Sequence, residues 1–199
     1  MDALSSVQGL VVSQKKEWGE IVTGFETRNK YAILDTHGNQ LYMAVEEEGS
    51  TLLRWFLKAM RPFQITVRNR DDQLVLRVVR PFRFFFHELD IFDSRGQLLG
   101  TLQRRFALLR RIYSVLDSSG RELFQIFGPI LHPWTFEIKT GDNEYGKITK
   151  KWSGLLIEGF TDADNFGVSF PAEWDKNVKA LFLGAVFLID FVHFENTGN

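Results

Sequence analysis

The sequence predicts a mainly β fold, a closed antiparallel barrel of about twelve strands around a hydrophobic C-terminal α-helix. Two observations predict it: a strand-and-turn unit that repeats along the chain, and an apolar C-terminal segment too short to cross a bilayer. With 199 residues and 44% hydrophobic content, the chain is long enough to bury such a core as one domain. We expect a short N-terminal tail over residues 1–8 and a single barrel domain over residues 9–197.

Five short runs carry the repeat, and each run ends in residues typical of tight turns. In every run the first and third residues are apolar, which is the period-2 pattern of a strand with one buried face. The runs are Tyr31–Asp35, Ile65–Asn69, Leu89–Asp93, Tyr113–Asp117 and Phe136–Thr140. Gly or Asp stands in the turn after each run and accepts the positive φ of a tight hairpin. The runs therefore predict five antiparallel hairpins.

The hairpins keep a nearly constant spacing. Asn69 to Asp93 and Asp93 to Asp117 are both 24 residues, whereas the first interval is longer because residues 52–57 insert an expected short helix. Five hairpins and a strand pair before Tyr31 give ten to twelve strands. A sheet of that many strands normally curls or closes into a barrel.

The C-terminal segment differs in kind, because every residue from Ala180 to Ile189 is apolar or glycine. A helix that is apolar all round must be buried in protein or in lipid. Ten residues span about 15 Å, whereas a bilayer core is about 30 Å thick. Extension brings in Lys179 and Asp190, and charges inside a span are costly. We predict a helix inside the barrel, beginning near Pro171, and keep a membrane span as the alternative.

The composition excludes several classes of function. The absence of cysteine removes disulfides, thiolate catalysis, cysteine-ligated zinc and palmitoylation. The formal net charge of −1 provides no overall electrostatic attraction to nucleic acid or to membranes. The segment Gly141–Ile148 resembles a phosphate-binding loop but lacks the Ser or Thr that would hold Mg²⁺, so we interpret it as a hairpin turn. No catalytic constellation is visible, and we expect no covalent chemistry.

Asp162, Asp164 and Glu173 form a candidate Ca²⁺ site. They occupy the first, third and twelfth positions of a calcium-binding loop, and Gly167 occupies the sixth. Phe166 stands at the fifth position and offers no side-chain oxygen, so any Ca²⁺ binding is expected to be weak. The alternative is a turn that leads into a helix, with acidic residues favourably placed near its N-terminus.

A locally basic segment forms the candidate lipid-binding site. Eight arginines lie between Arg77 and Arg111, against three acidic residues. Phe84, Phe85 and Phe86 lie inside the segment, and strand alternation cannot bury all three on one face. The candidate residues are Arg77, Arg80, Arg83, Phe84, Phe85, Phe86, Arg104, Arg105, Arg110 and Arg111.

Arginines beside exposed aromatics suit an anionic phospholipid surface. The alternative is ordinary surface arginine beside the end of a core strand. Single-stranded nucleic acid uses the same residue types, but nothing specific in the sequence favours it.

Several segments resemble the phospholipid scramblase family. They are residues 23–31, 61–63, 146–154, 160–167, 170–171 and 188–191. The similarity covers residues 9–197, and the stretch Phe160–Gly167 is its most specific part. The related fold is the tubby-like barrel, twelve strands closed around a central hydrophobic helix. This agrees with the barrel and helix expected from the residues alone.

The resemblance implies Ca²⁺-stimulated movement of phospholipids between the leaflets of a membrane. The family's calcium segment would be Asp162–Glu173 here, and its C-terminal helix would be Ala180–Ile189. Animal members carry cysteine clusters that become lipidated, whereas Phe84–Phe86 stand where one such cluster would fall. Our hypothesis is that these aromatics replace the lipid anchor, or that membrane attachment is lost.

Two functions therefore stay open. The first is a peripheral scramblase-type protein that binds anionic phospholipid and Ca²⁺. The second is a soluble tubby-like module that binds a phosphoinositide, a protein or nucleic acid and moves no lipid. The N-terminus shows no secretory signal pattern, so we expect the chain in the cytoplasm or at the cytoplasmic face of a membrane.

Overall fold

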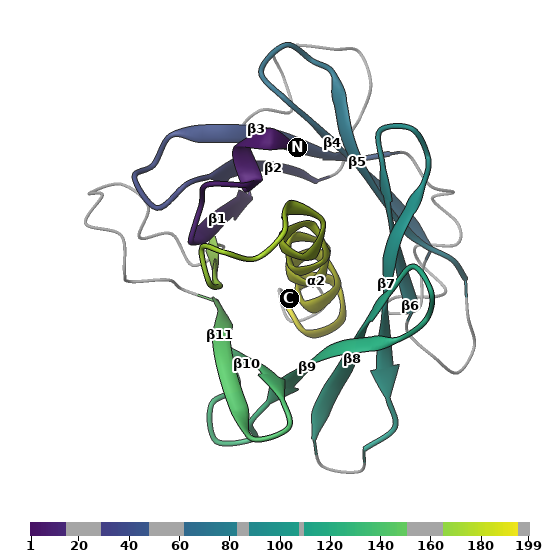
Figure 1. Cartoon of the computed structure of the whole chain (residues 1–199), viewed down its shortest axis with the longest axis vertical. Helices are drawn as coiled ribbons and strands as arrows, with labels where there is room; N and C mark the ends of the chain where they lie inside the picture. The colour runs from purple at the N-terminus through teal and green to yellow at the C-terminus, as the bar shows by residue number, and fades with distance from the viewer. Residues whose placement is uncertain (15–28, 48–61, 83–87, 108–109, 151–164, 195–199) are drawn as a thin grey trace.

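The computed structural model is a closed antiparallel barrel of twelve strands with a helix inside it (Figure 1). It describes residues 1–14, 29–47, 62–82, 88–107, 110–150 and 165–194. The strands are β1 Gly9–Gln14, β2 Lys30–Leu34, β3 Gln40–Glu46, β4 Phe63–Arg68, β5 Leu74–Arg80, β6 Glu88–Asp93, β7 Leu98–Arg105, β8 Arg111–Asp117, β9 Glu122–Gly128, β10 Thr135–Thr140, β11 Asn143–Lys150 and β12 Asn165–Ser169. A 3₁₀ turn, η1 (Asp2–Leu4), precedes them, and the helix α2 (Lys176–His193) follows. The predicted fold class is confirmed.

Each strand pairs with its neighbour in sequence, and the barrel closes where β1 pairs with β12. The five predicted hairpins are present as β2–β3, β4–β5, β6–β7, β8–β9 and β10–β11. The short helix expected at residues 52–57 lies outside the described residues.

Four of the hairpin turns share one geometry, which explains why their sequences look alike. A residue with positive φ stands at the same place in each turn: Gly38, Asp72, Gly96 and Gly120. Three residues earlier, the side-chain oxygen of Asp35, Asn69, Asp93 or Asp117 accepts two backbone N–H bonds. These four side chains therefore stabilise the turns.

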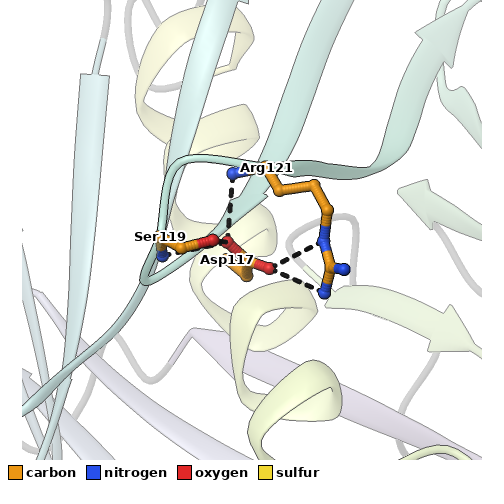
Figure 2. A network of polar contacts seen from close by, with 3 residues as sticks. All are labelled: Asp117, Ser119 and Arg121. Carbon is orange, nitrogen blue, oxygen red and sulfur yellow. Dashed lines mark hydrogen bonds and ion pairs between the residues drawn. The ribbon is translucent and has the colours of Figure 1, made fainter.

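Figure 2 shows this turn at Asp117. Asp117 Oδ1 accepts from the backbone nitrogens of Ser119 and Arg121 at 2.9 and 3.0 Å, and from the Ser119 hydroxyl at 2.6 Å. The Arg121 guanidinium donates to Oδ2 at 3.1 Å. The hydrogen bond from the Ser119 side chain, together with the backbone donors, lowers the pKa of Asp117 to about 2.

Helix α2 fills the barrel, as predicted. Every residue from Lys179 to Phe191 is buried, including the apolar segment Ala180–Ile189. The Phe191 ring stacks on Phe63 of β4 with centroids 4.0 Å apart. The helix begins at Lys176, five residues after Pro171, because the Asp175 side chain caps it by accepting from the backbone nitrogen of Asn177. No helix in the described part of the chain combines the length and hydropathy that a bilayer crossing requires.

Polar groups at both ends of α2 bond to the barrel. Near its start, the buried Lys179 ammonium donates to three backbone carbonyls. Near its end, the Tyr31 hydroxyl donates to Asp190 Oδ2 at 3.2 Å, and the Tyr113 hydroxyl lies 2.7 Å from His193 Nε2. Lys179 and Asp190, the charged residues on either side of the apolar segment, therefore each have hydrogen-bond partners outside the helix.

Candidate functional site

The two ends of the barrel differ in composition. One end carries the five tight hairpin turns, η1 and the start of α2, and we call it the turn end. The opposite end carries the last residues of α2 and the connections β5–β6, β7–β8 and β9–β10. We call the described residues of these three connections, 81–82, 106–107, 110 and 129–134, the rim. Adjacent strands place these connections side by side.

Apolar side chains are exposed at the rim. The described residues contain six large hydrophobic side chains that are exposed, and five of them belong to the rim. Exposed fractions are 39% for Phe82, 88% for Phe106, 62% for Ile130, 87% for Leu131 and 46% for Trp134. Single exposed apolar residues are common on proteins, but a group at one edge marks an interaction site.

The 129–134 loop is held in place by Arg111, the first residue of β8. The Arg111 guanidinium donates to the carbonyl oxygens of Pro133 and Pro129 at 2.8 and 3.1 Å. It also lies 4.5 Å above the centre of the Phe136 ring. Partial burial lowers the pKa of Arg111 from its ordinary value. Arg111 thus fixes the loop that presents Ile130 and Leu131.

Further contacts fix the end of this loop. The backbone nitrogen of Thr135 donates to the His132 carbonyl at 3.0 Å, and that of Lys150 donates to the Trp134 carbonyl at 2.9 Å. The Trp134 ring stacks on Phe194, just beyond α2, with centroids 5.3 Å apart. The loop is therefore ordered before any partner binds.

Basic side chains accompany the apolar ones. Arg105 and Arg110 are exposed on either side of Phe106, and Arg104 is half-buried. Arg105 lies 3.7 Å from Glu122, and Arg110 lies 5.8 Å from the centre of the Phe127 ring. The β7–β8 connection thus combines an exposed ring with accessible positive charge.

Tyr113 lies beneath this part of the barrel end. Its ring is buried, and burial raises the pKa of Tyr113 to about 12. The positive charges of Arg104, Arg111 and Arg80 act in the opposite direction without overcoming burial. Three guanidinium groups thus act on the buried Tyr113 hydroxyl, which lies beside His193 at the end of α2.

A polar pocket of about 510 Å³ opens at the turn end. Asp2, Asp93, Arg95 and Lys176 contribute to its lining. Lys176 Nζ lies 2.6 Å from Asp2 Oδ1, and Arg95 Nε lies 3.2 Å from Asp93 Oδ2. Lys176 and Arg95 of this pocket thus each pair with a carboxylate. Arg105 also lies near a carboxylate, that of Glu122, but there the arginines are accompanied by exposed apolar side chains.

The sequence model of the Scramblase family matches residues 1–196. The chain belongs to the Scramblase family. This scramblase-family chain is 35% identical to phospholipid scramblase 1 of Mus musculus, an alignment that covers 100% of the chain and 65% of that relative. It is 33% identical to phospholipid scramblase 1 of Homo sapiens, with 100% and 67% covered, and 32% identical to phospholipid scramblase 2 of Bos taurus, with 99% and 72% covered.

The scramblase-family chain thus spans about two thirds of the length of the first of these relatives. An X-ray structure of a protein from Arabidopsis thaliana shares the fold, with a TM-score of 0.50 and 14% identity over 93% of this chain and 91% of the other. The resemblance to the scramblase family is confirmed.

The predicted lipid-binding residues of the scramblase-family chain occupy different places. Arg104, Arg105, Arg110 and Arg111 come together beside Phe106 at one barrel end. Arg80, the last residue of β5, is buried, with its guanidinium 5.8 Å from the centre of the Phe63 ring.

The other predicted residues lie away from this group or outside the structure. Arg77 lies within β5, 5.3 Å from the centre of the Phe92 ring. Arg83 and Phe84, Phe85 and Phe86 lie outside the described residues.

Of the predicted Ca²⁺ ligands, Asp162 and Asp164 lie outside the described residues. Glu173 is exposed between β12 and α2. No group of three or more His, Asp or Glu side chains suited to a metal ion occurs in the part of the chain that the structure describes. Of the three predicted ligands, Glu173 alone lies among the described residues.

Sequence reasoning missed the apolar side of the rim. Its signal was the loop Pro129-Ile130-Leu131-His132-Pro133-Trp134, which is apolar where hairpin connections are usually polar. A second signal was the 24-residue spacing itself, because Phe82, Phe106 and Ile130 are 24 residues apart. The period that aligns the turns at one end also aligns these residues at the other.

Proposed function

We propose that this scramblase-family protein acts at membranes by binding anionic phospholipid. The observation that carries the proposal is the family match over nearly the whole chain. The gathering of Arg104, Arg105 and Arg110 beside exposed apolar side chains supports it. Guanidinium groups attract anionic headgroups, and each basic residue near such a surface contributes about 1 kcal/mol.

Binding of Ca²⁺ is part of the proposal. Asp162, Asp164 and Glu173 would hold the ion through carboxylate oxygens, which suit Ca²⁺. The test is the melting temperature with and without CaCl₂ for the natural chain and for the variant Asp162→Ala/Asp164→Ala. A calcium-dependent rise that the variant loses supports the site, and an equal rise in both proteins removes it.

We propose movement of phospholipid between leaflets as the family's activity, and binding without movement as the alternative. The packing of α2 supports the alternative for a single copy, because its whole apolar surface already contacts strands. Such a module would recognise a phosphoinositide, a protein or nucleic acid in solution, in the cytoplasm or at the cytoplasmic face of a membrane. Arginine contacts suit each of these partners.

Two measurements separate these functions. Flotation with phosphatidylserine-containing vesicles, with and without Ca²⁺, reports binding. A fluorescent-lipid flip assay on the same vesicles reports movement between leaflets. Flotation with flipping supports scramblase activity, flotation alone supports the binding module, and the absence of both overturns membrane action.

The variant Phe84→Ser/Phe85→Ser/Phe86→Ser tests the aromatic part of the predicted lipid site. We expect weaker flotation with an unchanged circular dichroism spectrum. Loss of the folded spectrum would instead assign these side chains to the core.

A further inference from the structure

We propose that the rim is the part of the barrel that enters the membrane, with Ile130, Leu131 and Phe106 as its penetrating side chains. This inference rests on the proposed function and adds the residues and the orientation. The end of the barrel at which α2 terminates faces the bilayer, and the turn end faces the solvent.

Exposure argues first for this surface. Leu131 and Phe106 leave 87% and 88% of their surface in water, and Ile130 leaves 62%. Burial of such side chains in the apolar part of a bilayer is favourable in proportion to the area removed from water. These residues belong to the neighbouring β7–β8 and β9–β10 connections at one end of the barrel, so one approach to a flat surface would insert them together.

Charge complementarity selects an anionic bilayer as the partner. The exposed Arg105 and Arg110 flank Phe106, where their guanidinium groups meet the headgroups while the ring enters below them. Trp134, 46% exposed, has the amphipathic indole that favours the level of the headgroups. An apolar protein surface would not supply the phosphates that these arginines need.

Preorganisation strengthens the inference. The hydrogen bonds from Arg111 to the Pro129 and Pro133 carbonyls hold both ends of the Ile130-Leu131 tip. Because the loop is already ordered, insertion costs little conformational entropy. Arg111 is thus a positioning residue, whereas Arg105 and Arg110 are exposed to lipid, which would compete with Glu122 for Arg105.

The first test reads orientation with a single fluorescent label. The chain has no cysteine, so Leu131→Cys carries the only thiol and accepts an environment-sensitive dye. Ser118→Cys, exposed in the β8–β9 turn, is the matched control at the turn end. With vesicles of phosphatidylcholine and phosphatidylserine, the dye at position 131 should shift its emission to the blue and be quenched by spin labels on the acyl chains. The dye at position 118 should do neither.

The second test reads affinity. Ile130→Ser/Leu131→Ser should weaken partitioning into these vesicles by about tenfold or more. Its melting temperature should stay unchanged, because both side chains are exposed. Tyr145→Ser, at an exposed aromatic on β11 away from the rim, should bind vesicles like the natural chain.

The outcomes distinguish this inference from the proposed function. If the natural chain does not float with the vesicles, both are overturned. If it floats but Ile130→Ser/Leu131→Ser floats equally, or the dye enters the bilayer at position 118 instead of 131, the rim inference alone is overturned. If the double variant instead abolishes self-association in sedimentation velocity while vesicle binding persists, the rim joins two copies of the chain.

Discussion

The ammonium nitrogen of Lys179 lies 2.7 Å from the carbonyl oxygen of Ala172, so the first turn of α2 is tied to the segment that follows β12. The same ammonium donates to the carbonyls of Ser5 and Val7 at 3.1 and 2.9 Å. Burial lowers the pKa of Lys179 from its ordinary value. One buried cation thus joins the N-terminal segment, the approach to the helix and the helix itself.

Replacement of Lys179 by Met should destabilise the fold by about 3 kcal/mol, because three carbonyl oxygens lose their donor. Urea denaturation followed by circular dichroism measures the change. Lys176→Met is the control, since Lys176 is partly exposed and pairs with the exposed Asp2. Equal stability of the two variants would show that the three hydrogen bonds contribute nothing.

Stability should fall in alkaline solution because buried tyrosines resist ionisation. Burial raises the pKa of Tyr113 from 10 to about 12. The contribution of Tyr113 is therefore complete below pH 10 and is lost as the pH rises through the folded value of about 12, a loss of about 2–3 kcal/mol. Burial likewise raises the pKa of Tyr42 to about 12, so Tyr42 adds to this loss of stability in alkaline solution.

The fall in stability with pH is measured from the urea concentration at the unfolding midpoint below pH 10 and at about pH 11. Tyr113→Phe should show a shallower loss than the natural chain. Tyr145→Phe, at an exposed position on β11, serves as the control. A Tyr113→Phe variant with the full alkaline slope would refute the assignment to Tyr113.

The turn at Asp117 should weaken in acid. The Ser119 hydroxyl and the backbone donors hold the pKa of Asp117 near 2, below its ordinary 3.8. Its contribution is therefore present above 3.8 and is lost as the pH falls toward 2. Melting temperatures across this range should converge for the natural chain and Asp117→Ala.

Asp117→Asn separates geometry from charge. Asn69 already accepts the two backbone bonds in the β4–β5 turn, so an amide oxygen fits this position. We expect Asp117→Asn to keep most of the neutral-pH melting temperature and to lose the acid dependence. If Asp117→Asn melts as low as Asp117→Ala, charge rather than turn geometry stabilises the hairpin.

Gly184 of α2 lies close to Ile91 on the barrel wall. A Cβ at this position would lie 2.8 Å from Ile91 Cγ1. Gly184→Ala gains about 1 kcal/mol of helix propensity but overpacks the core at a typical cost of about 1–3 kcal/mol. We expect a net loss of stability in thermal denaturation.

The effect of Gly184→Ala on stability should reverse its sign when the side chain of Ile91 is shortened. In an Ile91→Ala background the added methyl group enters vacated space, so Gly184→Ala should stabilise the protein. If Gly184→Ala destabilises the protein equally in both backgrounds, the strain does not come from contact with Ile91.

The hairpins could be predicted because local chemistry determines them. Alternation identifies the strands, and the positive φ at Gly38, Gly96 and Gly120 demands residues that are visible in the sequence. The helix could be predicted because Ala180–Ile189 is apolar all round and too short to cross a bilayer, which favours burial inside the barrel. Its start was placed too early, because Pro171 is compatible with a helix start whereas Asp175 supplies the cap.

The rim could be predicted only in part. Arg104, Arg105 and Arg110 are conspicuous as charges, but their partnership with Ile130 and Leu131 depends on the order of strands around the barrel. The structural role of Arg111 depends on two carbonyl groups, which have no signature in the residue types. Contacts between a side chain and backbone atoms distant in the sequence are the part of the site that residue types do not predict.

The pairing of β1 with β12 joins residues such as Gly9 and Ser169, which are separated by most of the sequence. During synthesis β1 therefore stays unpaired on this edge until β12 has left the ribosome. Contacts this remote slow folding and leave an open edge exposed to aggregation. We therefore expect folding of the barrel to depend on protection of the open edge of β1 until β12 has been made.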